Sequence, residues 1–363
     1  MKILLSGATS GTNFGDFLFA QIFYDIVSKM IGNENTYFCD NNFVMSEFFK
    51  KNLNYNKKCK VKEMDALIFI SGGYFCGDDK GIKDYTIRFL RYFVVGLLFC
   101  FSKKPIVIIG NDIGAINNSF LLKCAKKILN SADLISVRNI ESVQYLKQYH
   151  ITTDYFVTSD TAQVLESGYI KDYTPPFEIR PDKKYLFFHI FTNIKKNRET
   201  VYRLIPPVLQ FLEKNSEYEL VVGCDQYEEF QDEVLEDIKK EINKKVILYK
   251  YEKPLELFEL LNHMDYIITP KLHVGIVGCS LGKSVLSFSV HTQKIERYYK
   301  QINEVERSIP LEKCSEKTVI ERLNKYKNVP VVINADIRRA AQYNLELLQQ
   351  FILELEDKKC VRQ

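Results

Sequence analysis

The amino-acid sequence predicts an α/β protein with two domains, each built on a parallel β-sheet. Its 363 residues exceed the size at which one hydrophobic core usually keeps growing, so two domains of roughly 150 to 180 residues are expected. Short apolar runs alternate with helical stretches along the chain, which is typical of parallel strands joined by crossover helices. A polar stretch with Pro175, Pro176 and Pro181 lies near the middle and is suited to an interdomain linker.

The expected strands form one group on each side of this linker. The first group is 3–6, 66–71, 106–110 and 134–137, and the second is 185–190, 218–222, 246–249, 266–269 and 285–289. Strands that alternate with helices on both sides predict two Rossmann-like domains. We expect the N-terminal domain to cover residues 1–174 and the C-terminal domain to cover 182–333.

The last segment, 334–363, is expected to form a helix that packs back on the N-terminal domain. Its apolar residues recur every three or four positions, which describes one face of an amphipathic helix. These residues are Ile337, Ala341, Leu345, Leu348, Ile352 and Leu355.

Composition excludes several classes of function. The net charge of +4 is small and dispersed along the chain, so a nucleic-acid partner is not expected. The nine cysteines include no Cys-x-x-Cys pair and no Cys/His cluster with metal-ligand spacing. We therefore expect reduced thiols, no metal site and a cytoplasmic location. The apolar start of the chain is too short for a signal peptide, which agrees with that location.

One apolar stretch leaves two interpretations open. Residues 92–101 are almost entirely apolar, and Arg88, Arg91, Lys103 and Lys104 flank them. The stretch is too short to span a bilayer, which takes about 20 residues. It is either a helix buried in the N-terminal domain or a peripheral membrane contact through 88–104, in which the helix lies in the membrane interface.

The most informative motif lies in the C-terminal domain, after the strand at 266–269. Lys271 and His273 stand two residues apart at the start of a buried helix. The backbone N–H groups and the dipole at a helix start favour an anion, so this site suits a small phosphate or carboxylate. The later triplet Gly282, Lys283 and Ser284 is not a nucleotide P-loop, because it ends a helix rather than beginning one. Gly282 is expected to end that helix in the left-handed conformation.

Further polar motifs follow the strands of the N-terminal domain. Ligands of open α/β sheets lie at the carboxyl ends of the strands, so these positions are candidate binding residues. The candidates are Asn13, Gly15 and Asp16 after the first strand, Gly72 and Gly73 after the second, and Arg138 after the fourth.

Together these segments resemble the polysaccharide pyruvyl transferase family, whose members are similar to GT-B glycosyltransferases in architecture. The resemblance covers most of the chain. It rests on Asn13-Phe14-Gly15-Asp16, Gly72-Gly73, Ser136-Val137-Arg138 with Ser142, Ser159-Asp160, and the block from Lys271-Leu272-His273 to Gly282-Lys283-Ser284-Val285.

The resemblance implies transfer of the enolpyruvyl unit of phosphoenolpyruvate onto two hydroxyls of one sugar. The products would be a cyclic pyruvate ketal and phosphate, with phosphoenolpyruvate as a co-substrate and without a cofactor or metal. The acceptor would be a lipid-linked or nucleotide-linked sugar used in the biosynthesis of a surface polysaccharide, such as a capsule or exopolysaccharide. The donor would bind on the C-terminal domain and the acceptor on the N-terminal domain.

The resemblance also assigns roles to residues. The catalytic candidates are His273, Asp16 and Asp160, of which His273 is the expected acid/base or phosphate contact, since an imidazole titrates near neutral pH. The expected donor-binding residues are Lys271, Leu272, His273, His189 and Arg198. The expected acceptor-binding residues are Asn13, Gly15, Asp16, Gly72, Gly73 and Arg138. Asp16 and Asp160 have an alternative role as helix caps, and Arg138 as a surface ion pair with Glu141 or Asp133.

Lys271 departs from the family pattern, in which this motif reads Arg-Leu-His. A guanidinium grips a carboxylate or phosphate through two parallel hydrogen bonds, whereas an ammonium acts as a flexible point charge. Two rival functions therefore stay open. One is a GT-B glycosyltransferase that uses a nucleotide sugar, with Glu296 on the ribose, and the other is a catalytically silent sugar-binding protein.

Overall fold

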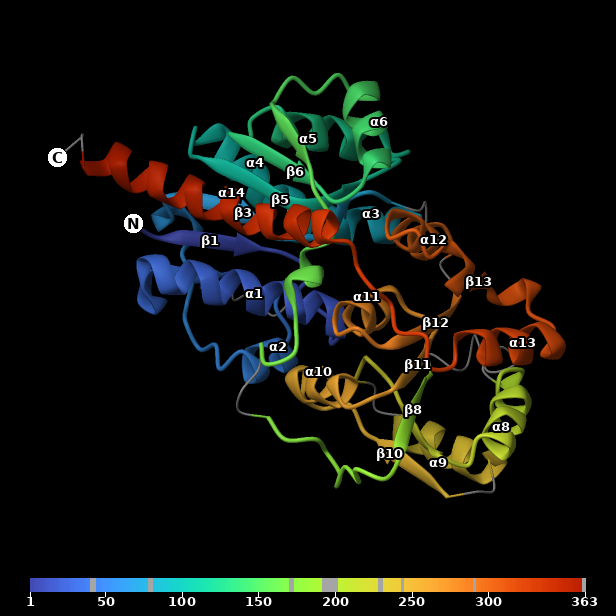
Figure 1. The fold of residues 1–363 in the computed structure, drawn as a ribbon. Helices are drawn as coiled ribbons and strands as arrows, with labels where there is room; N and C mark the ends of the chain where they lie inside the picture. Colours follow the sequence, from blue (N-terminus) through green and yellow to red (C-terminus); the bar gives the residue numbers. More distant parts are fainter. Residues whose placement is uncertain are drawn as a thin grey trace. The chain divides into compact units, whose positions relative to one another are not determined.

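The computed structural model describes residues 1–39, 44–77, 81–169, 173–190, 202–227, 231–242, 245–289 and 292–360. The chain divides into two compact units, which Figure 1 shows in sequence colours. Unit 1 comprises Met1–Thr12, Asp16–Val164 and Ala335–Gln363, and unit 2 comprises Asn13–Gly15 and Leu165–Asn334.

Unit 1 is built on a seven-stranded parallel sheet with the order β2-β1-β3-β5-β6-β7, in which β4 also pairs with β5. The strands are β1 (Ile3–Ser6), β2 (Thr36–Phe38), β3 (Ala66–Phe69), β4 (Gly72–Phe75), β5 (Ile106–Ile113), β6 (Leu134–Val137) and β7 (Tyr155–Val157). The helices are α1 (Phe14–Ile31), α2 (Glu47–Asn52), α3 (Ile82–Arg88), α4 (Val94–Phe101), α5 (Ser119–Leu129), α6 (Ile140–Gln148) and α14 (Ala335–Cys360). Every residue of β1, β3 and β5 is buried, as expected for parallel strands that are covered on both faces.

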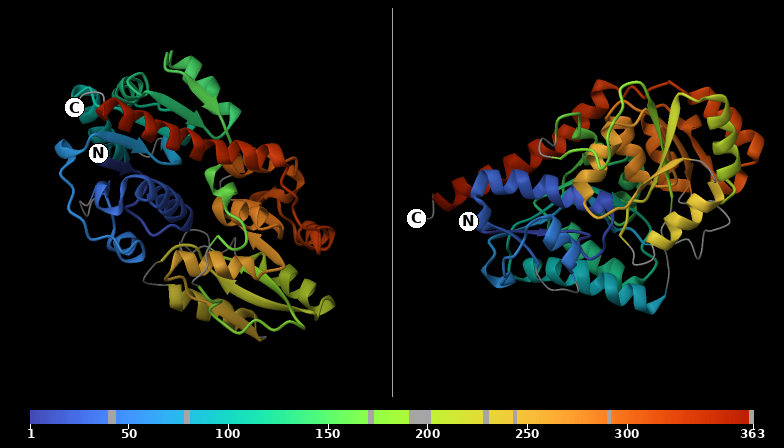
Figure 2. Two further views of the ribbon diagram at one scale, coloured as in Figure 1. Left: turned by 60° about the vertical axis from the view of Figure 1, so that its left-hand side comes forward. Right: turned by 90° about the horizontal axis from the view of Figure 1, so that it is seen from below.

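The C-terminal helix α14 packs on the sheet of unit 1, and both views in Figure 2 show it running along that sheet. A buried polar contact fixes its position. Asn344, which is fully buried, accepts a hydrogen bond of 2.7 Å from the Ser136 hydroxyl and donates one of 2.9 Å to the carbonyl of Ser159. The expected packing of this segment on the N-terminal domain is confirmed.

Unit 2 contains a six-stranded parallel sheet with the order β10-β9-β8-β11-β12-β13. The strands are β8 (Lys184–His189), β9 (Tyr218–Gly223), β10 (Val246–Tyr249), β11 (Tyr266–Thr269), β12 (Ser284–Ser289) and β13 (Ser308–Pro310). The helices are α8 (Ile205–Lys214), α9 (Gln231–Ile242), α10 (Pro254–Asn262), α11 (Leu272–Ser280), α12 (Thr292–Gln301) and α13 (Glu316–Tyr326). In chain order the strands run 3-2-1-4-5-6, which is the arrangement of a doubly wound dinucleotide-binding domain.

The predicted fold class, α/β with two Rossmann-like domains, is confirmed by these two parallel sheets. The division between the units lies at Val164 and Leu165, earlier than the linker suggested by the prolines. Residues just after this division contact unit 2, since the Ser280 hydroxyl donates to the carbonyl of Leu165 and the ring of Tyr169 lies 6.3 Å from that of Phe258. Gly282 has a φ of +68°, as expected for a residue that ends a helix in the left-handed conformation.

The described ranges contain neither a membrane-spanning helix nor a cluster of metal ligands. Among the helices of these ranges, none has an apolar stretch long enough to cross a bilayer. Within the same ranges, no group of three or more His, Cys, Asp or Glu side chains is placed to hold a metal ion.

Candidate functional site

The candidate site in unit 2 lies where the strand order of its sheet reverses, between β8 and β11. Ligands of doubly wound folds bind outside the carboxyl ends of the strands at this point. His189 is the last residue of β8 and Thr269 is the last residue of β11. Their side chains meet, because Nδ1 of His189 lies 2.7 Å from Oγ1 of Thr269. His189, a predicted donor-binding residue, therefore lies at the position where the fold favours a ligand.

Lys271 follows Thr269 at the start of helix α11. It is the N-cap residue, with an extended backbone (φ −114°, ψ 150°), and its N–H donates a hydrogen bond of 3.1 Å to Oγ1 of Thr269. Leu272 and His273 form the first two positions of the helix and are half-buried. The predicted motif is thus at a helix N-terminus, where the dipole favours a bound anion.

Asp225 connects these residues, and it was not among the predicted ones. Its carboxylate is almost fully buried, and Oδ1 lies 3.2 Å from Nε2 of His189 and 3.5 Å from Nζ of Lys271. Oδ2 accepts a hydrogen bond of 3.3 Å from the amide of Asn13, and the backbone carbonyl accepts one of 2.9 Å from the N–H of Phe14. Asp225 lies two residues after the end of β9 at Gly223, so the same rule that selects polar residues after strands could have identified it.

The charges around Asp225 determine its ionisation. Burial raises the pKa of this carboxyl, but the positive charges of Lys271 and His189 and their hydrogen bonds lower it more, so that the pKa lies well below its usual value. The carboxylate is therefore ionised throughout the physiological range. Oδ1 of Asp225 lies 3.2 Å from Nε2 of His189, and Nδ1 on the other side of the same ring lies 2.7 Å from the Thr269 hydroxyl.

His273 packs against Gly15, so two predicted residues lie in contact. A Cβ atom added to Gly15 would lie 1.9 Å from Nδ1 of His273 and 2.2 Å from its Cγ. Only a glycine leaves room for the imidazole at this place. Asn13 and Gly15 both group with unit 2 by their contacts, which brings these two predicted acceptor residues to the donor motif.

The other predicted acceptor residues lie in unit 1: Asp16 in the first turn of α1, Gly72 and Gly73 in β4, and Arg138 directly after β6. Gly72 begins β4, and a Cβ atom there would lie 2.3 Å from the ring of Tyr74. Tyr74 stacks on Tyr92 with ring centres 4.8 Å apart. Burial, with the negative charge of Asp16, raises the pKa of Tyr92 to about 12, and the same two causes raise that of Tyr74. Asp16 therefore lies close to two tyrosines, which are common partners of sugar rings and hydroxyls.

Arg138 and Asp160 contact each other inside unit 1. The guanidinium is buried and pairs with Asp160 at 2.9 Å and with Asp112 at 3.2 Å. Burial lowers the pKa of Arg138, but the two carboxylates raise it more, and it lies above the usual value. Asp160 also accepts a hydrogen bond of 3.0 Å from the N–H of Ala162, in the manner of a helix cap. These contacts favour a structural role for the pair, with Asp112 as a partner that the sequence pattern did not indicate.

Three predicted residues remain to be placed: Arg198, Gly73 and Glu296. Arg198 lies outside the described residues. Gly73 is half-buried within β4 rather than in a loop. Glu296, named for the rival nucleotide-sugar enzyme, is exposed on α12.

The start of α11 brings together groups that could bind an anion and transfer a proton. Asp225 pairs with the ammonium of Lys271 and with the fully buried ring of His189, and the imidazole of His273 lies against Gly15. An ammonium and a helix N-terminus can bind a phosphate or carboxylate, and an imidazole can in general transfer a proton near neutral pH.

Solved structures with the same fold include UDP-GlcNAc 2-epimerases. The enzyme of Methanocaldococcus jannaschii matches with a TM-score of 0.63 and 11% identity, over 96% of this chain and 100% of that chain. The enzyme of Neisseria meningitidis, solved with UDP-GlcNAc, matches with a TM-score of 0.59 and 13% identity, over 96% and 100%. At this identity the likeness shows the fold alone, and it confirms that the GT-B type of two-domain fold extends over the chain.

The sequence of the chain identifies its family. No curated protein matches the chain in sequence. A family model, described as polysaccharide pyruvyl transferase, matches residues 13–292. This match begins at Asn13 and includes Asp225, Lys271 and His273, the residues that form the site in unit 2. Because it covers more than half of the sequence, the chain belongs to the polysaccharide pyruvyl transferase family.

Proposed function

We propose that this protein transfers the enolpyruvyl group of phosphoenolpyruvate to two hydroxyls of a sugar and so forms a cyclic pyruvate ketal. The family supports a transferase that acts in polysaccharide biosynthesis. The observation that carries the proposal further is the position of Lys271 and His273 at the start of α11, next to the point where the strand order reverses. A small phosphorylated acid suits this position because both of its anionic groups need cations or helix N–H groups.

In the proposed complex, Lys271 and the N-terminus of α11 bind the phosphate or carboxylate of the donor. The ammonium of Lys271 lies 3.5 Å from Asp225, so its position is held before the donor arrives. His189 is held in turn by Thr269 and Asp225, which fixes the orientation of its ring. These fixed groups reduce the reorganisation that binding and reaction would otherwise require.

His273 is the proposed acid/base group. The methylene carbon of phosphoenolpyruvate takes a proton and becomes a methyl group, and one sugar hydroxyl attacks the adjacent carbon while losing its own proton. The bond from that carbon to the phosphate oxygen then breaks, phosphate leaves, and the second hydroxyl attacks the same carbon. Over the whole reaction one hydroxyl proton balances the methyl group and the other leaves with phosphate. An imidazole suits these steps because it both gives and takes a proton near pH 7.

For the acceptor, we propose Asp16 with its neighbours Tyr74 and Tyr92 in unit 1, and Asn13 next to the donor motif. A carboxylate orients sugar hydroxyls by accepting their hydrogen bonds. We propose a lipid-linked or nucleotide-linked sugar as the acceptor, and a function in the cytoplasm.

The test is an incubation of the purified protein with phosphoenolpyruvate and a panel of galactosides, glucosides and mannosides. We expect phosphate release together with an acceptor whose mass increases by that of pyruvate minus water. Parallel incubations contain a nucleotide sugar in place of phosphoenolpyruvate. Consumption of the nucleotide sugar alone would contradict the proposal and support a glycosyltransferase, and no turnover with any donor would support a sugar-binding protein.

A further inference from the structure

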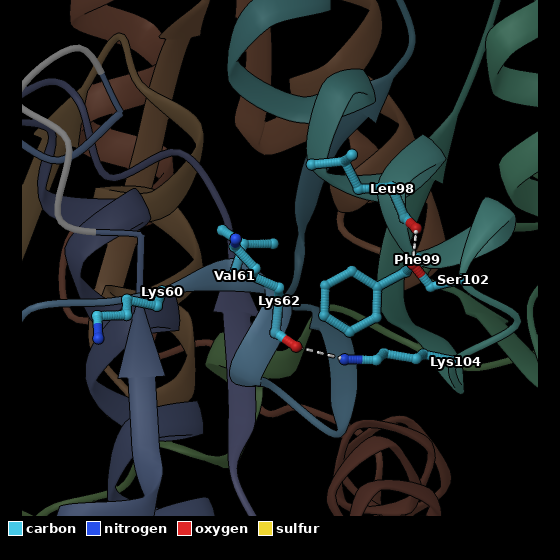
Figure 3. A pocket seen from close by; sticks show the side chains of 7 residues that line it. All are labelled: Lys60, Val61, Lys62, Leu98, Phe99, Ser102 and Lys104. Atoms are coloured by element: carbon cyan, nitrogen blue, oxygen red, sulfur yellow. Dashed lines mark hydrogen bonds between the residues drawn. The ribbon is translucent and has the colours of Figure 1, made fainter.

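A cavity of about 450 Å³ lies in unit 1, and its lining includes none of the candidate-site residues described above. It is formed between the end of helix α4 and the segment around Val61, and Figure 3 shows its lining. The lining residues are Lys60, Val61, Lys62, Leu98, Phe99, Ser102 and Lys104. Lysines alternate with apolar side chains in this lining, and it contains no carboxylate. The chemistry of the cavity thus suits an apolar chain attached to an anionic group.

Helix α4 itself is apolar on its outer face as well as on its inner face. Its inner face, with Val95 and Phe99, is part of the hydrophobic core of unit 1. On the outer face Leu98 is 49% exposed and Phe101 is 75% exposed, and Leu90 on the preceding turn is 48% exposed. A surface helix of a globular protein normally carries polar residues on its outer face. The eight residues of α4 include no charged side chain, so the outer face favours an apolar environment.

Cationic side chains surround this apolar face. Lys103 follows α4 and is exposed, and Lys60 and Lys62 are exposed on the opposite side of the cavity, where Lys60 also pairs with Glu63 at 3.3 Å. The ammonium of Lys104 is fixed at the cavity by hydrogen bonds of 2.8 Å and 2.6 Å to the carbonyls of Lys62 and Met64, the first of which is drawn in Figure 3. Apolar side chains with a border of lysines are typical of proteins that lie in the interface of an anionic membrane.

We propose that the α4 surface, made of Leu98, Phe101, Lys60, Lys62, Lys103 and Lys104, docks unit 1 on a bilayer that contains anionic lipids. Leu98 and Phe101 enter the interfacial region, the lysines contact the headgroups, and the cavity accepts part of one lipid chain. The charge of the border selects an anionic bilayer over a second copy of this chain, because a second copy would bring the same lysines into proximity. The inference concerns membrane binding and does not depend on pyruvyl transfer. It is therefore tested with vesicles in the absence of phosphoenolpyruvate.

A single tryptophan makes the docking measurable. The sequence contains no Trp, so Phe101→Trp introduces one reporter on the α4 surface. We expect brominated lipids to quench its fluorescence in vesicles of phosphatidylcholine mixed with phosphatidylglycerol, and little quenching in vesicles of phosphatidylcholine alone. The matched control is Val332→Trp, at a site in unit 2 that is 84% exposed. Its fluorescence is expected to stay unquenched.

Sedimentation with the same vesicles separates the contribution of the apolar side chains to binding from that of the lysines. Phe101→Ser and Leu98→Ser should each lower partitioning about tenfold, since burial of such a side chain contributes at least about 1.5 kcal/mol. Lys62→Gln and Lys103→Gln should each lower it about fivefold. Controls in unit 2 are Val332→Ser and Lys317→Gln, both at exposed positions, and they should bind like the unchanged protein.

Three results of the vesicle experiments would overturn the inference. They are the absence of sedimentation with anionic vesicles, equal losses in the control variants, and binding that persists at about 1 M salt, where charges are screened within roughly 3 Å. A dimer in analytical ultracentrifugation that Phe101→Ser dissociates would show that a second copy covers the surface, which also contradicts it. Thermal unfolding of each variant shows whether it is folded, and the sites are exposed enough for substitution to leave the fold intact.

Discussion

Single side chains determine the chemistry that the site in unit 2 can perform. His273 is held against Gly15 at the second position of α11, and its exposure is intermediate. An imidazole in this position can be either an acid/base group or a packing residue. The two roles give different results when the side chain is removed.

We predict that His273→Ala lowers turnover by about 10² to 10⁴ fold, the usual contribution of a proton-transfer group. The melting temperature should change little. The control is His263→Ala, because His263 lies in the same unit outside the candidate site and pairs with Glu259 at 2.9 Å. Unchanged turnover, or a large loss of stability, would make His273 a packing residue.

Lys271 stands where the family has an arginine, so the reverse substitution is informative. We predict that Lys271→Arg keeps or increases the affinity for phosphoenolpyruvate, because a guanidinium forms two parallel hydrogen bonds to a carboxylate or phosphate. Isothermal titration calorimetry with phosphoenolpyruvate measures this. Lys253→Arg, at an exposed site, is the control. A complete loss of binding would assign the lysine another task.

The ionised carboxylate of Asp225 makes a pH-dependent contribution to stability. Its pKa in the folded protein lies below the ordinary value of 3.8. A depressed pKa means that the contribution is full above about pH 4 and is lost as the pH falls further. We predict that Asp225→Asn lowers the free energy of unfolding by about 3 kcal/mol at pH 7, since it removes the buried carboxylate that pairs with Lys271 and His189.

Denaturant unfolding at a series of pH values checks this prediction. The difference between the unchanged protein and Asp225→Asn should narrow as the pH falls below about 4. Asp232→Asn, which removes an exposed partner of Lys250, should cost less than about 1 kcal/mol. A difference for Asp225→Asn that stays constant with pH would show that its ionisation does not stabilise the fold.

Some residues of the site could be predicted from the sequence and others could not. Lys271 and His273 could, because an apolar run after a strand marks the start of a buried helix. Asp225 could have been selected by its place after β9, but the ion pairs that distinguish it from other polar residues after strands join it to residues far along the chain, such as His189 and Lys271. Arg138 was expected to face a ligand, and its long-range pair with Asp112 was likewise absent from any local pattern.

At the scale of elements, the start of helix α1 depends on the glycine at position 15, which has no side chain. Gly15 lies in the first turn of α1, and an added Cβ atom would overlap the imidazole of His273. We predict that Gly15→Ala displaces either the helix start or the imidazole and lowers turnover at least about tenfold, since small misplacements of catalytic groups are costly. Steady-state kinetics measures this effect.

A second glycine provides the control for this prediction. Gly168→Ala also adds one methyl group, at a position with no atom within 4 Å of the new Cβ but with a φ of +86°. Its cost is limited to about 1 kcal/mol of backbone strain, without an effect on turnover. Equal turnover of Gly15→Ala and the unchanged protein would show that the contact with His273 is not needed.

Helix α14 is fixed to unit 1 by the buried amide of Asn344. We predict that Asn344→Leu lowers the free energy of unfolding by about 2 kcal/mol, because it leaves the buried Ser136 hydroxyl and Ser159 carbonyl without this partner. Denaturant unfolding measures the change. Asn324→Leu, at an exposed position on α13, should change stability by less than about 0.5 kcal/mol. Equal effects of the two substitutions would contradict the structural role of the buried amide.

The elements were predictable to different degrees. The expected strands at 3–6, 134–137, 246–249 and 266–269 coincide with β1, β6, β10 and β11. The strands β2, β7 and β13 have three residues each, which is too short for a pattern to show. Gly72 and Gly73 were expected to follow a strand that ends at residue 71, but they belong to a separate strand, β4, which pairs with β5.

For the whole molecule, the alternation of strands and helices predicted the fold class because it follows from the requirement that parallel sheets be covered on both faces. The exact division of the chain did not follow from it. Asn13–Gly15 group with unit 2 although they lie near the N-terminus, and Ala335–Gln363 group with unit 1 although they follow unit 2 in sequence. Such groupings depend on long-range contacts that no local pattern contains.

The most direct test of the proposed function is the reaction with phosphoenolpyruvate and an acceptor sugar in deuterium oxide, followed by NMR of the product. If the donor carbon takes its proton from exchangeable groups, the ketal carries a methyl group with one deuterium, and one phosphate is released for each ketal formed. An acceptor that gains a sugar from a nucleotide sugar, while phosphoenolpyruvate is unchanged, would contradict the account.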